Sequence, residues 1–394
     1  MATETASSAL SGIKVLDLAA LFPAPLLAAM MGDYGADVVK VEPPHGDGLR
    51  GVGAPTSGNS STAWSLAGRN KRSVALDLNS RRGLKILADL TAVADVIVTN
   101  QSRKQLQIWS CAPEQIAARN PGAVVVSLTG FGSTGPLRDT GANGTIAEAF
   151  SGVADLIGQT QGPPTLASFA LGDTLAAISA LNGVLAALYW RDANGGRGQF
   201  IDASLYEPLI GMLASTYAGW NDNDPPPTRN GSRLALAAPR NLYQSADGSW
   251  VALSATTDAQ VARVFDLIST DSTTRTRYAT SHNRVGIAAD DLDAAVAKWI
   301  ASLPLAVVVA RCDAARIPVA RVQSMDEVMQ HPHTMHRQNF IPLSTDDHSV
   351  RVPAPTPRLS ATPGRFHRAA PKIGEHTDEV LRDWLTRDHA ADRT

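Results

Sequence analysis

The sequence feature that most constrains the fold is an alternation of strand-like and helix-like segments between residues 13 and 129. The strand-like segments are short apolar runs at 13–18, 36–42, 73–78, 95–99 and 123–129. Segments with helical signals lie between them at 25–34, 83–93 and 113–119. Short connections between alternating strands and helices predict an α/β fold with a mostly parallel sheet covered on both faces. Ligands of such sheets bind at the carboxyl ends of the strands.

The length of 394 residues exceeds what one hydrophobic core usually holds, because single cores seldom grow past roughly 250–300 residues. The pattern is helical at 145–189, a short strand follows at 199–203, and a helix is expected at 205–220. Residues 221–229 contain three consecutive prolines in a polar setting and predict a linker. Residues 241–313 open with a hairpin signal, Asp247-Gly248, and predict a separate small domain.

The composition excludes several classes of protein. Apolar residues make up 44% of the chain, which is enough to exclude whole-chain disorder. With 35 basic and 37 acidic residues, the chain has no charge excess that would favour a nucleic acid or a membrane surface as its partner. We expect no membrane-spanning helix and no signal peptide in Met1–Leu10. The two cysteines, Cys111 and Cys312, cannot form a disulfide framework, so a reducing, cytoplasmic location is expected.

A glycine-rich segment, Gly130–Gly135 (GFGSTG), follows the fifth strand-like run and matches the G-x-G-x-x-G pattern of dinucleotide sites. Pro136 and the turn-like residues after it do not begin a helix, and Asp155 lies in a helical segment rather than at a strand end. We therefore disfavour a nicotinamide or flavin site. A flexible loop whose backbone approaches a ligand remains the expectation.

Asp173, within Leu171-Gly172-Asp173-Thr174, stands just before a helix expected at 175–190. One interpretation is structural, because aspartate is a favoured N-cap and its charge suits a helix N-terminus. The other is chemical, because a carboxylate presented by a glycine-containing turn can attack a thioester or another acyl group. The sequence leaves both interpretations open.

Two further groups of residues suggest ligands. His331, His333 and His336 lie close together, but no carboxylate or cysteine accompanies them, so no metal site is predicted. The basic pairs 71–72 and 103–104 flank strand-like runs. If both pairs lay on one edge of the sheet, they would suit a phosphorylated ligand.

Taken together, segments along nearly the whole chain resemble the family III CoA transferases, the CaiB/BaiF group. Among them are LGDTLAA at 171–177 and GGRGQFIDASLYE at 195–207; each segment alone is weak, and the ordered set is specific. Other matching segments lie at 10–25, 31–50, 70–78, 94–100, 120–136, 150–152, 315–332 and 373–381.

The resemblance implies a domain layout that composition and periodicity do not show. It implies a large Rossmann-like CoA-binding domain built from residues 1–222 and 320–394, and a small α+β middle domain at 232–315. Residues 223–231 and 316–319 would be the linkers. Two copies of the chain would interlock as a homodimer.

The resemblance also implies a reaction. Asp173 would attack an acyl-CoA to form an aspartyl anhydride and then an aspartyl-CoA thioester, moving CoA from one carboxylic acid to another without a metal or redox cofactor. Gly130, Gly132 and Asn143 would belong to the active-site loop. The residues that would contact coenzyme A are Phe22, Pro23, Leu76, Asp77, Leu78, Asn79, Asn100, Gln101, Ser102, Arg103 and Lys104.

Several positions depart from the family pattern. Pro43 and Ile108 stand where some members have basic residues, so Arg103 or Lys104 would have to replace them as phosphate ligands. Asn143 stands where the α-methylacyl-CoA racemase branch has a histidine base, which disfavours the alternative of a racemase or epimerase. A non-catalytic acyl-CoA-binding protein is the third alternative. Glu148 stands where transferases often have glutamine, and the sequence gives no role for it.

Overall fold

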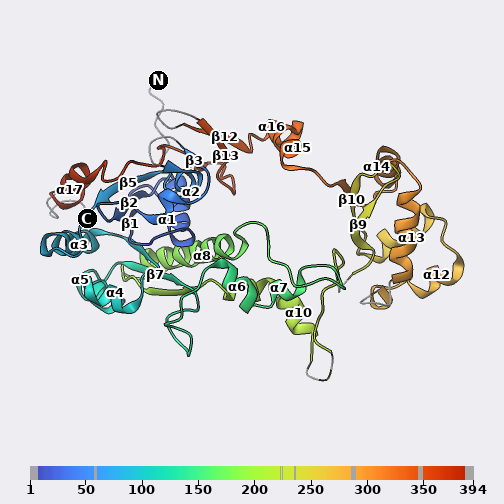
Figure 1. The fold of residues 1–394 in the computed structure, drawn as a ribbon, viewed down its shortest axis with the longest axis horizontal. Coiled ribbons are helices and arrows are strands. Elements are labelled where there is room, and N and C mark those ends of the chain that lie inside the picture. The colour runs from blue at the N-terminus through green and yellow to red at the C-terminus, as the bar shows by residue number, and fades with distance from the viewer. Residues whose placement is uncertain are drawn as a thin grey trace. The chain divides into compact units, whose positions relative to one another are not determined.

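The computed structural model describes residues 8–56, 60–221, 223, 225–234, 237–284, 290–344 and 349–386. The chain divides into two compact units (Figure 1). The first contains residues 1–153, 167–218 and 336–394, and the second contains residues 154–166 and 219–335. Residues 1–7, where no signal peptide is predicted, and residues 222 and 224 of the predicted linker lie outside the described residues.

The first unit is built on a six-stranded sheet in the order β5-β2-β1-β6-β7-β8, and every neighbouring pair is parallel. The prediction of an α/β fold with a parallel sheet is therefore confirmed. The strands are β1 Lys14–Asp17, β2 Asp37–Glu42, β5 Lys71–Ala75, β6 Val96–Thr99, β7 Val124–Thr129 and β8 Phe200–Ser204.

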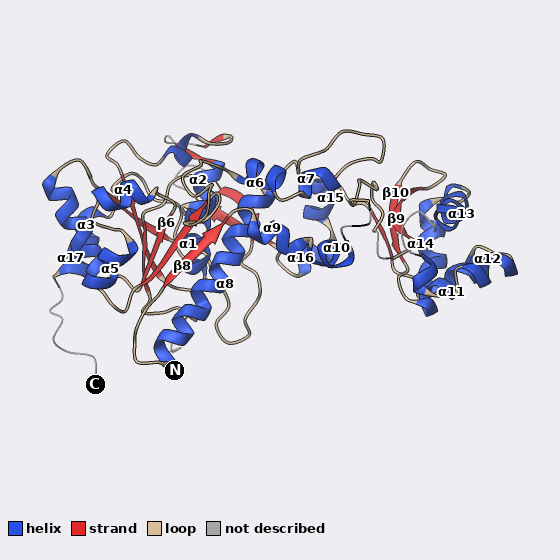
Figure 2. Cartoon of the chain, turned by 90° about the horizontal axis from the view of Figure 1, so that it is seen from below, coloured by secondary structure: helices blue, strands red, loops and turns tan. Residues whose placement is uncertain are grey.

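Helices cover both faces of this sheet (Figure 2). One face carries α3 Arg81–Val93, α4 Arg103–Ile108, α5 Pro113–Arg119 and α17 Thr377–Leu385. Their apolar side chains form one core with the strands, including Leu87 of α3 and Trp384 of α17. On the other face, α1 Pro23–Asp33 packs against the long helix α8 Leu171–Ala193, which also contacts β7 and β8.

The helix α8 is long and apolar enough to cross a membrane by length and composition, and it is the one such helix among the described residues. It packs on the sheet and on α1, as a helix of a layered α/β domain does. The segment 145–189 that the sequence predicts to be helical contains three helices: α6 Gly144–Phe150, α7 Val153–Leu156 and α8. The helix expected at 205–220 is two short helices, α9 Glu207–Met212 and α10 Ala214–Gly219, that meet at Leu213.

The basic pairs at 71–72 and 103–104 do not share one edge of the sheet, so that hypothesis is wrong. Lys71 and Arg72 begin β5, at the amino edge, whereas Arg103 and Lys104 follow the carboxyl end of β6. The strand begins two residues earlier than predicted because Lys71 lies inside the core, where its ammonium group pairs with the Asp17 carboxylate at 2.6 Å.

The second unit contains an antiparallel sheet in the order β11-β10-β9, made of β9 Arg240–Gln244, β10 Trp250–Ser254 and β11 Val319–Arg321. The predicted hairpin at Asp247-Gly248 joins β9 to β10, and Gly248 takes a positive φ of 80°. The helices α11 Asp258–Leu267, α12 Ser272–Arg277, α13 Asp290–Ala301 and α14 Leu305–Ala314 accompany this sheet. This unit has its own core.

The remaining elements are short. They are η1 Gly48–Gly51, β3 Pro55–Thr56, β4 Ser60–Ser61, α2 Thr62–Ala67, η2 Ser281–Arg284, α15 Met325–Gln330, α16 Pro332–His336, β12 Phe340–Ser344 and β13 Ser349–Pro353.

Candidate active site

Asp173 is the third residue of α8, not its N-cap, so the capping interpretation is wrong. The helix begins at Leu171, and its N-cap, Ala170, offers no side-chain oxygen to the free N–H groups of the first turn. A carboxylate in the first turn still lies in the favourable field of the helix N-terminus.

The backbone around Asp173 is packed unusually closely against the start of α6. A Cβ atom on Gly172 would lie 2.9 Å from the carbonyl oxygen of Gly144, and a Cβ atom on Gly144 would lie 2.8 Å from the Asp173 Cγ. The two glycines are therefore required for this approach. The approach brings the Gly144 N–H into a hydrogen bond with the Asp173 carboxylate.

The Asp173 carboxylate is only partly satisfied. Its Oδ1 atom is buried and has no hydrogen-bond partner among the described residues. Burial raises the pKa of Asp173, the Gly144 N–H acts in the opposite direction, and repulsion from Glu148 raises the pKa further. A partly buried carboxylate with a raised pKa and one buried, unpaired oxygen is a candidate nucleophile.

Glu148 is a site residue to which sequence reasoning gave no role. It lies on α6 and is 3% exposed. Its Oε1 atom accepts a hydrogen bond from the Gly172 N–H at 3.3 Å, and its Oε2 atom accepts one from the Ala167 N–H at 3.1 Å. Its position one helical turn after Gly144 was the sequence signal that could have placed it near Asp173.

The predicted glycine loop follows β7 and leads to α6. At Gly130, an added Cβ atom would lie 2.5 Å from the Ala142 Cβ, so the loop passes close to the residues just before α6. Gly132 takes a positive φ of 84° next to Asp202. Asn143 caps α6, because its Oδ1 atom accepts a hydrogen bond from the Ile146 N–H at 3.2 Å. The next helix after the loop begins only at Gly144, which agrees with rejecting a dinucleotide fingerprint.

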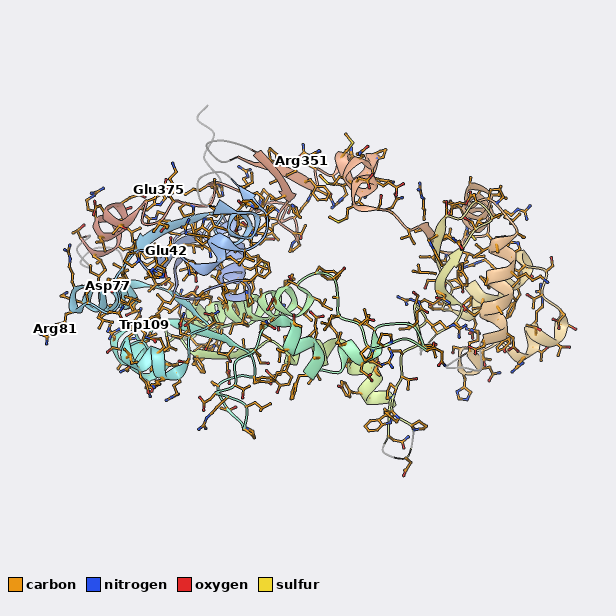
Figure 3. The ribbon with its side chains drawn as sticks, in the orientation of Figure 1. Glu42, Asp77, Arg81, Trp109, Arg351 and Glu375 are labelled. Atoms are coloured by element: carbon orange, nitrogen blue, oxygen red, sulfur yellow. The ribbon has the colours of Figure 1, made fainter. Side chains whose placement is uncertain are left out.

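A cavity of about 770 Å³ opens outside the carboxyl ends of β1, β2, β5 and β6. Of the predicted coenzyme A contacts, the cavity lining includes Leu76, Asp77, Leu78, Asn79 and Gln101. In Figure 3, Asp77 and Trp109 lie on the same side of the first unit, and Arg81 projects from its outer edge. The size suits part of a cofactor-sized ligand.

The other predicted contacts do not line this cavity, and most have roles in holding the loops. Phe22 packs on the Leu49–Trp64 cluster and Pro23 begins α1. Asn100 ties two loops together through the N–H and the carbonyl oxygen of Ala20. The remaining residues belong to α4: Ser102 caps the helix, exposed Arg103 pairs with Glu114 at 2.9 Å, and Lys104 is exposed.

The buried charges of Lys40 and Glu42 in the cavity wall are compensated within the protein. Lys40 is the one lysine or arginine among the described lining residues, and it pairs with Asp47 at 2.8 Å and donates a hydrogen bond to the Ala19 carbonyl oxygen. Glu42 is bound by Arg50 at 2.6 Å. Sequence reasoning missed Lys40, Asp47 and Trp109, because buried pairs and cavity walls depend on tertiary contacts.

The histidine group shows no metal-binding arrangement. The His333 N–H donates a hydrogen bond to His331 Nδ1, which is a local turn contact. Within the described ranges, no group of three or more His, Cys, Asp or Glu side chains is arranged to hold a metal ion.

Comparison with known proteins relates the chain to one family over almost its whole length. A sequence model of CoA-transferase family III matches residues 10–377. The chain is 35% identical to the succinyl-CoA–L-malate CoA-transferase beta subunit of Chloroflexus aurantiacus, over 97% of this chain and 95% of the relative. It is 31% identical to the succinyl-CoA–D-citramalate CoA-transferase of the same organism, over 98% and 96% of the two chains.

A solved structure of the same family has a similar fold. A crystal structure of a CaiB/BaiF family protein from Brucella suis superposes with a TM-score of 0.80 at 26% identity, covering 96% of this chain and all of that chain.

Proposed function

The chain belongs to CoA-transferase family III, and we propose that Asp173 is the nucleophile with which it moves CoA between carboxylic acids. The observation that carries the proposal is the buried, unpaired Oδ1 atom of Asp173 at the start of α8. An oxygen without a donor has no hydrogen bond to break before it attacks. A raised pKa makes the carboxylate a better nucleophile once it is ionised.

The proposed reaction has four steps. The Asp173 carboxylate attacks the thioester carbonyl of the donor, CoA thiolate leaves, and a mixed anhydride forms. The thiolate then attacks the aspartyl carbonyl, which releases the donor acid and leaves an aspartyl-CoA thioester. The acceptor carboxylate attacks that thioester, giving a second anhydride and free thiolate. The thiolate finally attacks the acceptor's acyl carbonyl, which forms the new acyl-CoA and restores Asp173.

We assign the coenzyme to the cavity at the carboxyl ends of β1, β2, β5 and β6, because predicted contact residues from the loops after β5 and β6 meet there. We further propose that backbone N–H groups of the loop that contains Gly130 and Gly132 stabilise the oxyanion that forms in each addition step. Neither a metal nor a redox cofactor takes part in the proposed steps.

The substrates are proposed from the relatives. The names of the relatives include succinyl-CoA as donor, and L-malate, D-citramalate and glutarate as acceptors. We therefore propose that this chain uses a short dicarboxylic acid as acceptor.

The chain is further proposed to act as a cytoplasmic homodimer. Outward-facing apolar residues of α8, including Leu185 and Tyr189, support the dimer.

The test replaces Asp173 with Asn or Ala and measures transfer from succinyl-CoA to a panel of dicarboxylic acids by mass spectrometry. We expect at least about a thousandfold loss of transfer with an unchanged circular dichroism spectrum, because the covalent route is removed. Wild-type protein incubated with acyl-CoA should carry a hydroxylamine-sensitive CoA adduct on the peptide that contains Asp173. Full activity in either variant would refute the assignment.

Two further measurements, α-proton exchange and acyl-CoA binding, separate the proposed transferase from the two alternatives. A racemase would exchange the α-proton of a branched acyl-CoA with deuterated water in the absence of an acceptor. Asn143, which has no basic group at neutral pH, argues against it. A non-catalytic binding protein would bind acyl-CoA and give no transfer to any acid.

A further inference from the structure

We propose that Glu148 is a positioning residue: it caps α8 from the neighbouring helix and thereby holds Asp173 against Gly144. The inference rests on the proposed nucleophilic role of Asp173. Glu148 does not line the cavity at the carboxyl ends of the strands, and its two hydrogen bonds go to backbone N–H groups at the start of α8.

The first part of the argument is the missing cap of α8. The first N–H groups of a helix have no partner within the helix and need one from outside. Ala170, at the N-cap, has no side-chain acceptor. The Glu148 carboxylate provides the acceptor. Its Oε1 atom accepts a hydrogen bond from the Gly172 N–H at 3.3 Å, and its Oε2 atom accepts one from the Ala167 N–H at 3.1 Å.

The second part is burial. Glu148 is 3% exposed, so water does not compete for these two hydrogen bonds. A carboxylate at a helix N-terminus is also favoured by the helix dipole. One buried side chain thus fixes both the segment that leads into α8 and the first turn of the helix itself.

The third part is the route to Asp173. Gly172, which donates to Glu148, directly precedes Asp173 in the chain. Gly144 lies one turn before Glu148 on α6, and its backbone touches both Gly172 and the Asp173 carboxylate. A shift of α8 relative to α6 would therefore open the Gly144–Asp173 hydrogen bond, and Glu148 resists that shift.

The negative charge of Glu148 also affects the pKa of Asp173, which a pH profile can measure. The repulsion between Glu148 and the Asp173 carboxylate, added to burial, raises the pKa of Asp173. The other elements packed against α8 carry carboxylates that have donors of their own: Asp33 of α1 with Arg69, Asp202 of β8 with Ser133, and Glu207 of α9 with Ser204. Glu148 is the charged group that acts on Asp173 among the described residues.

The test compares Glu148→Gln with Glu148→Asp. Glutamine has one acceptor oxygen, so one of the two N–H groups loses its partner and the negative charge disappears. Aspartate keeps the charge but is one methylene shorter and cannot reach both N–H groups. We expect kcat to fall at least about tenfold in both variants, with the KM for acyl-CoA within about twofold of wild type.

The pH profile separates charge from position. Asp173 reacts as a carboxylate, so kcat/KM falls as the pH drops through its pKa. Removing the like charge lowers that pKa, so this acid limb should move to lower pH in Glu148→Gln. Glu148→Asp keeps the charge and weakens the Gly144 hydrogen bond that lowers the pKa, so its acid limb should not move to lower pH. Glu379→Gln, on α17 away from α8, is the matched control and should leave kcat and the acid limb unchanged.

The outcomes distinguish this inference from the proposed function. If the wild-type protein forms no covalent adduct at Asp173, the proposed function fails whatever Glu148 does. If the wild type forms the adduct and Glu148→Gln forms it at the same rate with the same acid limb, the positioning role is overturned. If Glu148→Gln does not fold, Glu148→Asp decides the question: wild-type kcat in that variant rejects the positioning role.

Discussion

Asp17, at the end of β1, is fully buried and holds two ammonium groups in the core of the first unit. Lys71 lies 2.6 Å from one of its oxygens, and Lys40 lies 3.9 Å from the other. Burial, opposed by Asp17 and reinforced by the nearby Lys40 charge, lowers the pKa of Lys71 to about 8. The Asp17 carboxylate is therefore the counter-ion of the buried Lys71 ammonium group, whereas Lys40 also has Asp47 at 2.8 Å.

Replacing Asp17 with Asn should reduce the free energy of unfolding by about 3–5 kcal/mol, because the buried Lys71 ammonium group would lose its carboxylate partner. Urea denaturation at pH 7 measures the effect. The matched control is Asp89→Asn, which breaks the exposed Lys85–Asp89 pair and should cost less than about 0.5 kcal/mol. Similar small losses in both variants would contradict the account of the buried pair.

At the scale of helices and strands, sequence patterns placed the elements well and their ends less well. The helix predicted at 113–119 has the same bounds as α5, and the predicted helix at 83–93 begins two residues earlier, at Arg81, after the N-cap Ser80. The start of α8 was placed too late, because the acceptor for its first turn, Glu148, comes from another helix. Local sequence cannot report a cap that arrives from 24 residues away.

The ends of α3 and α4 at the cavity bear on coenzyme A binding. Arg103 and Lys104 in the first turn of α4 are the predicted phosphate ligands, although Arg103 pairs with Glu114. We expect the double variant Arg103→Ala/Lys104→Ala to bind CoA about tenfold more weakly by calorimetry, through lost charge-assisted hydrogen bonds. Binding of S-succinylpantetheine, which lacks the phosphates, should not change.

The matched double variant Arg81→Ala/Arg82→Ala removes the exposed arginines that follow the cavity loop 76–79 on α3. Unchanged CoA affinity in the α4 variant would show that Arg103 and Lys104 do not bind the phosphates. A loss confined to the α3 variant would place the phosphate ligands on α3 instead.

At the scale of the whole molecule, the first unit presents an apolar surface on α8. Ile178, Leu185 and Tyr189 follow helical spacing, and Tyr189 is 79% exposed. Phe200, on the edge strand β8, is also exposed. A contiguous exposed apolar face on an α/β domain is typical of a protein interface.

This surface leads to a prediction about assembly. A negative charge in an apolar interface opposes association, so the double variant Leu185→Glu/Tyr189→Glu should shift the protein from dimer to monomer in light scattering at micromolar concentration. Lys85→Glu, on the exposed surface of α3, is the control and should leave the mass unchanged. A wild-type protein that is already monomeric would contradict the proposed homodimer.

The sequence by itself determined the parallel α/β sheet and the β9–β10 hairpin, because strand patterning and turn chemistry are local properties of the chain, and it singled out Asp173 as a candidate nucleophile. Tertiary structure alone decided the close approach of Gly144 to Gly172, the cap that Glu148 provides and the cavity walls that Lys40 and Trp109 help to form. These features depend on residues that are distant in sequence or belong to different elements. Burial and hydrogen bonding act between them only after the sheet and helices have packed.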